Sequence, residues 1–216
     1  MKQKPDLNIQ DDNGFTIAML AFKYCKNKDV LLELLKQKPD LNIQTDYGYT
    51  ITMFAFKYCQ DKDVLLELLK QNPDLNIQDN DGNTIAMYAF IFRKNKDVLL
   101  EVLRQKSDFD IQDKYGLTVI FYAFINYTDK YVLLEILKQK PDLTLKNYKN
   151  KTALDYALEF YVKSPNFKFD VLEKLYNENC KQDNQIVNLD YIRIKRKYKV
   201  LPLILFRYQK RYFYKN

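Results

Sequence analysis

The sequence predicts an all-α protein, a solenoid of about five helix pairs followed by a basic C-terminal segment. Two observations predict this fold: an internal repeat of 34 residues, and two short apolar segments with helical character in each repeat unit. The hexapeptide PDLNIQ begins at residues 5, 39 and 73, and its variants SDFDIQ and PDLTLK begin at 107 and 141. Residues 17–44 and 51–78 differ at only five positions. One helix pair of this size cannot bury its own apolar faces, so neighbouring pairs are expected to stack into a continuous core.

The first helix of each unit, as in TIAMLAFKY, is expected to begin at a threonine, because a threonine side chain suits the N-cap position. The same helix has alanine at one fixed place, where a small side chain lets two helices approach closely. The threonines are Thr16, Thr50, Thr84, Thr118 and Thr152, and the alanines are Ala21, Ala55, Ala89, Ala123 and Ala157.

The second helix, as in DVLLELLKQ, is apolar on so many sides that it must be covered from several directions. An asparagine or aspartate precedes it as N-cap, and in three units a proline follows and ends it. The N-cap residues are Asn27, Asp61, Asn95 and Asp129, and the prolines are Pro39, Pro73 and Pro141. The predicted helix pairs are 16–25/28–37, 50–59/62–71, 84–93/96–105, 118–127/130–139 and 152–163/169–179. In the fifth pair the insertion SPNFKF lengthens the loop between the helices.

The chain has only four glycines, Gly14, Gly48, Gly82 and Gly116, and each lies 34 residues from the next in a turn between units. Each is expected to supply a positive φ that other residues adopt at a cost. Asn150 stands in this register in the fifth unit, and asparagine tolerates the same conformation. A phosphate-binding loop would need several glycines in one place, so these positions are interpreted as turn geometry.

These units resemble ankyrin repeats. The family pattern D-x-x-G-x-T-P-L-H-x-A is matched by DDNGFTIAMLA, TDYGYTITMFA, DNDGNTIAMYA, DKYGLTVIFYA and NYKNKTALDYA, within a resemblance that spans about residues 5–180. The Lys-, Asn-, Tyr- and Ile-rich composition favours a low-GC bacterial, viral or protist member. The resemblance implies a solenoid that binds other proteins and has no enzymatic activity. The family histidine is replaced by Met19, Met53, Met87, Phe121 and Asp155, which removes the hydrogen bonds that this histidine makes between repeats, so apolar packing is expected to substitute.

Several function classes are disfavoured by what the chain lacks. It has no histidine, the commonest general base and zinc ligand, and its three cysteines are scattered, so we expect no catalytic site, cofactor or metal. The start MKQKPDLNIQ has no apolar core of a signal peptide, and no apolar run approaches the roughly 18 residues of a membrane span. We therefore expect a cytoplasmic protein, or one in the host cytoplasm or nucleus if it is viral or a secreted effector.

The family resemblance implies that a partner protein contacts the turn tips and the concave surface of the first helices. By register, Tyr24, Tyr58 and Phe92 are expected to form an aromatic row with Lys23 and Lys57 beside it. Aromatic residues with a polar group are favoured anchors at interfaces. Alternatively, these rings pack between neighbouring repeats and the two lysines face solvent. The candidate protein-binding residues are Lys23, Tyr24, Tyr47, Tyr49, Lys57, Tyr58, Asp81, Phe92 and Tyr115.

The C-terminal segment, predicted as a separate region over 181–216 after an array over 1–180, carries the basic charge. Residues 186–216 have a net charge of +8, whereas the remainder of the chain has −1. Three interpretations stay open. VLPLILF packs as a cap on the last repeat, or the flanking cations and aromatics bind nucleic acid or an anionic membrane. The third is that LPLILFRY, which resembles the Leu-Pro element of ubiquitin-ligase adaptor boxes, has that adaptor role. The candidate anion contacts are Arg193, Lys195, Arg196, Lys197, Arg207, Lys210 and Arg211.

The first unit has no polar capping helix, and the segment 16–25 has the pattern of an internal helix. Either an unusual element covers this end, or the array associates with itself or with another chain.

Overall fold

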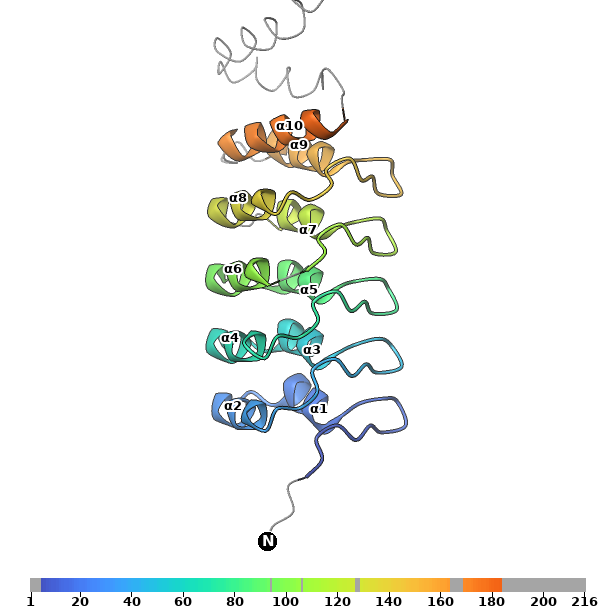
Figure 1. The fold of residues 1–216 in the computed structure, drawn as a ribbon, viewed down its shortest axis with the longest axis vertical. Helices are drawn as coiled ribbons and strands as arrows, with labels where there is room; N and C mark the ends of the chain where they lie inside the picture. Colours follow the sequence, from blue (N-terminus) through green and yellow to red (C-terminus); the bar gives the residue numbers. More distant parts are fainter. Residues whose placement is uncertain (1–4, 94, 106, 127–128, 164–168, 184–216) are drawn as a thin grey trace, which may run out of the picture.

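A computed structural model of the chain describes residues 5–93, 95–105, 107–126, 129–163 and 169–183. The described residues form ten helices and no strand, stacked as five pairs in a solenoid (Figure 1). The odd-numbered helices form one column, the even-numbered helices form a second, and the turns project beyond the odd-numbered column. The helices are α1 (Ile17–Tyr24), α2 (Lys28–Lys36), α3 (Ile51–Tyr58), α4 (Lys62–Leu69), α5 (Ile85–Phe92), α6 (Lys96–Arg104), α7 (Val119–Ile125), α8 (Lys130–Lys138), α9 (Ala153–Lys163) and α10 (Phe169–Asp183).

The predicted helix starts are confirmed by their caps. The Asn27 side chain accepts hydrogen bonds from the N–H groups of Asp29 and Val30, and Asp61 and Asn95 cap α4 and α6 in the same way. Asp129 caps α8 by accepting from the Tyr131 N–H. The Thr16 hydroxyl accepts from the Met19 N–H at 3.2 Å. Thr118 holds the N-cap position of α7 without a side-chain bond. Helix α10 continues to Asp183, so the region boundary predicted at residue 180 falls inside a helix.

The core lies between successive repeats. Each odd-numbered helix packs on the next odd-numbered helix, and each even-numbered helix on the next even-numbered one. Ala55, Ala89, Ala123 and Ala157 are fully buried at these contacts, as expected for residues that allow a close approach. No helix among the described residues has the length and apolar composition needed to cross a bilayer.

Hydrogen bonds connect adjacent repeats although the family histidine is absent. The Gln10 side chain donates to the Gln44 carbonyl at 2.9 Å, and Gln44 repeats this bond to Gln78. Gln78 and Gln112 extend the same ladder along the stack. Within the unit, the sulfur of Met19, which stands in the histidine position, accepts the Thr16 N–H at 3.4 Å. The bonds between repeats thus come from glutamine side chains in the turns, whereas the histidine position holds a buried methionine whose sulfur bonds within its own unit.

The turn glycines have the expected positive φ, between 73° and 81°, and Asn150 has φ of 56° in the fifth unit. The structure adds a second reason for glycine. A Cβ on Gly48 would lie 2.7 Å from the Cα of Asp79 and 2.8 Å from the backbone nitrogen of Asn80, both in the next turn. The turns stack backbone against backbone, which leaves no room for a side chain at this position.

The first unit has the exposed face of an internal repeat. Ile17 is 56% exposed and Val30 is 50% exposed, whereas their equivalents Ile51 and Val64 are fully buried by the preceding repeat. This is the face that self-association would use, and self-association stays a prediction.

Candidate functional site

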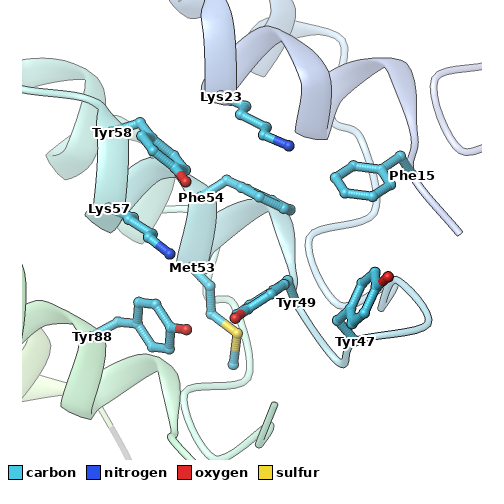
Figure 2. A pocket seen from close by; sticks show the side chains of 9 residues that line it. All are labelled: Phe15, Lys23, Tyr47, Tyr49, Met53, Phe54, Lys57, Tyr58 and Tyr88. Carbon is cyan, nitrogen blue, oxygen red and sulfur yellow. The ribbon is translucent and has the colours of Figure 1, made fainter. Parts of the chain in front are cut away.

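A hollow of about 340 Å³ opens on the side of the turns and odd-numbered helices, across the first three repeats. Figure 2 shows its lining side chains pointing toward one another from two turns and three helices. They are Phe15, Lys23, Tyr47, Tyr49, Met53, Phe54, Lys57, Tyr58 and Tyr88. Five of these, Lys23, Tyr47, Tyr49, Lys57 and Tyr58, are predicted site residues. The solenoid therefore brings five of the nine candidate protein-binding residues into one concavity.

Helix α3 supplies the centre of the hollow. Met53, Phe54, Lys57 and Tyr58 recur at the spacing that places residues on one face of a helix. Met53 is buried at the base, whereas Lys57 and Tyr58 at the end of the helix are half-buried. The neighbouring repeats complete the site from either side, so it exists only when three units stack.

The aromatic rings form a network that differs from the predicted row. Phe54 is its hub, with ring centroids 5.5 Å from Phe15, 5.6 Å from Tyr49 and 6.2 Å from Tyr58. Tyr88 joins Tyr49 edge-to-face at 6.2 Å and extends the network to Phe92 at 5.5 Å. The rings of Tyr58 and Phe92 thus belong to one cluster, but through Phe54 and Tyr88 rather than by direct contact.

Phe54 and Tyr88 were missed as site residues, although the sequence carries a signal for them. They precede Tyr58 and Phe92 by four positions, which places each pair on one helical face. The equivalent residue in the first unit is Leu20, so an aromatic residue at this position appears only from the second unit onward.

The two lysines of the hollow lie against aromatic rings. The Lys23 ammonium is 5.0 Å from the ring centroid of Phe15, 5.1 Å from Tyr24 and 5.9 Å from Phe54. The Lys57 ammonium is similarly placed over Tyr49, Tyr58 and Phe92, at 5.6–6.0 Å. Cation–π contacts of this kind stabilise an ammonium by roughly 0.5–1 kcal/mol at exposed sites. The rings thus contact one another across repeats, as the packing interpretation expects, but both lysines lie against rings, and binding of a partner stays a prediction.

Tyr88, which lines the hollow, is hydrogen-bonded to the buried carboxylate of Asp79. The Tyr88 hydroxyl donates to Asp79 at 2.8 Å, and Asp79 also accepts the backbone N–H groups of Asp81 and Asn83. Burial raises the pKa of Tyr88, and the adjacent Asp79 carboxylate raises it further, so the phenol stays protonated. The Asp79 carboxylate thus accepts hydrogen bonds from its own turn and from Tyr88.

The remaining predicted residues lie outside the hollow. Tyr24 is 67% exposed at the end of α1, and Phe92 is 40% exposed at the end of α5. Asp81 on the third turn tip forms an ion pair with Lys114 at 2.8 Å. Tyr115 on the fourth tip contacts Tyr148 on the fifth, with ring centroids 5.7 Å apart. The tips of the third to fifth repeats are thus joined by side-chain contacts that lie outside the hollow.

Among the described residues, no group of three or more Cys, Asp or Glu side chains lies close enough together to hold a metal ion. Cys25 and Cys59 are both free thiols, and burial raises the pKa of Cys59, which disfavours the reactive thiolate. The candidate anion contacts of the tail, from Arg193 to Arg211, lie outside the described residues.

The family model for ankyrin repeats (3 copies) matches residues 1–79 and 18–100. This chain belongs to the ankyrin-repeat family. Among solved structures, the ankyrin array is similar to a chain in the complex of the predatory endopeptidase Bd0816 from Bdellovibrio bacteriovorus with the immunity protein Bd3460. The identity is 30% and the TM-score 0.61, over 82% of this chain and 87% of that one. No curated protein sequence matches the chain.

Proposed function

We propose that this ankyrin protein is a non-enzymatic interaction scaffold that binds a partner protein on its concave surface, with the hollow of the first three repeats at the centre. The observation that carries this proposal is the hollow itself. It brings four exposed or half-buried aromatic rings and two lysines together in one concavity, and aromatic residues are enriched at protein interfaces.

Two further observations support a protein partner. Ankyrin repeats are a general protein-interaction fold. The similar Bdellovibrio chain comes from a complex of two proteins. We further propose a cytoplasmic location, which rests only on the sequence.

The test is affinity capture from an extract of the native host, with the whole chain as bait. Tyr58→Ala removes one wall of the hollow, and Tyr131→Ala is the matched control, because Tyr131 is 63% exposed on α8 and lies outside the hollow. The proposal expects a partner that the wild-type chain and Tyr131→Ala capture equally and that Tyr58→Ala captures poorly. Equal capture by all three proteins would refute the hollow as the binding site.

The alternative roles of the C-terminal segment are separated by the same experiment. A chain truncated after residue 185 should capture the partner normally if the hollow binds it. Salt-dependent binding of DNA, RNA or anionic vesicles that disappears with the truncation would instead favour the tail. Loss of a captured ubiquitin-ligase subunit on truncation would favour the adaptor role.

A further inference from the structure

The lysines of the hollow differ from the lysines of α2, α4 and α6, each of which forms an ion pair with a carboxylate of the described residues. On the even-numbered helices, Lys28 pairs with Asp63, and Lys62 pairs with Asp97 at 3.3 Å. The i,i+3 pairs led by Lys36 and Glu33 repeat along the same helices. By contrast, neither Lys23 nor Lys57 lies within ion-pair distance of a carboxylate in the described part of the chain; their partners are rings.

Both lysine residues are half-buried, and their side chains are directed into the hollow, as Figure 2 shows. A ring attracts a cation but accepts no strong hydrogen bond, so the three N–H donors of each lysine stay available. A carboxylate entering the hollow would form charge-assisted hydrogen bonds with these donors, in a site where the surrounding rings reduce competition from water.

The character of this surface changes along the stack. The register position of Lys23 and Lys57 is occupied by Ile91 and Ile125 in the third and fourth repeats, and both isoleucines are half-buried. Phe92, 40% exposed, lies next to Ile91. One position on the concave face is therefore cationic over α1 and α3 and apolar over α5 and α7.

We propose that the partner docks through an acidic segment with an adjoining apolar portion. Its Asp or Glu carboxylates pair with Lys23 and Lys57, and aliphatic or aromatic side chains that follow lie over Ile91 and Phe92. Packed helices have axes about 8–10 Å apart, so the two lysines select carboxylates at roughly that separation. This inference rests on the proposed function and names the chemistry of the partner.

The test selects peptides from a random display library on the full-length protein. The pool is then counter-selected against the double variant Lys23→Gln/Lys57→Gln. The retained peptides are expected to be enriched in Asp and Glu beside apolar residues. The best peptide is then synthesised twice, once as selected and once with Asn in place of Asp and Gln in place of Glu. The amide version should bind about tenfold more weakly or worse, because charge-assisted hydrogen bonds are roughly twice as strong as neutral ones.

The matched control is Lys28→Gln/Lys62→Gln, which removes two lysines from the same repeats but from ion pairs on the even-numbered helices. It should leave peptide affinity within about twofold, since exposed pairs contribute little. The proposal is overturned if no peptide is retained, if the amide peptide binds as well as the acidic one, or if both double variants behave alike. Selective recovery of phosphopeptides over carboxylate peptides from a phosphorylated library would also overturn it.

The failure of this inference is distinguishable from failure of the proposed function. If Tyr58→Ala abolishes capture of the host partner while Lys23→Gln/Lys57→Gln does not, the hollow is the binding site but the acidic segment is wrong. If neither change affects capture, both proposals are wrong.

Discussion

Replacement of Gly48 by alanine should strongly destabilise the array, for two separable reasons. The residue has φ of 79°, and an L-residue in the left-handed region costs roughly 1–2 kcal/mol. The new Cβ would also lie 2.7 Å from the Cα of Asp79, and backbone atoms on both sides must move apart, which costs about 1–3 kcal/mol by analogy with overpacked cores. Together, the expected loss is roughly 2–5 kcal/mol, a large part of the stability of a domain of this size.

Asparagine at the same position separates the two causes. Gly48→Asn relieves most of the dihedral cost, because asparagine tolerates a positive φ, but it retains the overlap with Asp79 and Asn80. The expected loss is therefore about 1–3 kcal/mol. The natural residue Asn150 is the matched control. It has φ of 56° and is exposed, and no later turn among the described residues stacks on it, so Asn150→Gly should change the free energy of unfolding by less than about 1 kcal/mol.

The measurement is urea unfolding of each variant, followed by circular dichroism and by tyrosine fluorescence. Coincident transitions are required before free energies are compared, because repeat arrays unfold in parts when their cooperativity fails. The expected order of stability is wild type and Asn150→Gly, then Gly48→Asn, then Gly48→Ala. A Gly48→Asn variant as stable as wild type would show that the close approach of the turns has no energetic consequence. A Gly48→Ala variant within about 0.5 kcal/mol of wild type would refute the reasoning as a whole.

Three further predictions concern side chains that connect the repeats. Burial raises the pKa of Tyr88, so above pH 10 this residue ionises in the unfolded chain but not in the folded chain. The contribution of Tyr88 to the free energy of unfolding is therefore fully present below pH 10, and it falls by up to about 1.4 kcal/mol per pH unit above pH 10. Tyr88→Phe should flatten that alkaline decline in urea unfolding, and an unchanged slope would contradict the assignment. Gln44→Ala removes two hydrogen bonds to backbone carbonyls and should lower the free energy of unfolding by about 1 kcal/mol in urea unfolding. Gln37→Ala is the control, because the Gln37 side chain is exposed, and it should leave the free energy of unfolding nearly unchanged. Arg93→Ala should cost about 1–3 kcal/mol in thermal unfolding, because the buried guanidinium donates to the Phe56 carbonyl near the end of α3; a neutral effect would show that water replaces the bond.

Most of the fold was predictable because its signals are local. The threonine and asparagine caps, the proline after the second helix and the positive-φ turn residue each act within a few positions of the chain. The prediction that Asn150 substitutes for glycine is confirmed for the same reason. The candidate site was predictable only in part. Tyr49 and Tyr58 were identified by register, whereas Phe54 and Tyr88, the residues that join the rings into one network, were not.

The sequence by itself determined the repeat, the helix boundaries, the caps and the conformation of the turns, since each depends on residues close together in the chain. Only the tertiary structure decided which side chains meet across repeats. Stacking brings together residues such as Gln10 and Gln44, Gly48 and Asp79, or Lys23 and Phe54, which lie about one repeat apart in sequence. No local preference specifies those distances; they follow from how closely the turns and helices of adjacent units pack. The same packing places Lys23 and Lys57 against aromatic rings instead of carboxylates. It also brings side chains of three repeats together around the hollow on which the proposed function rests.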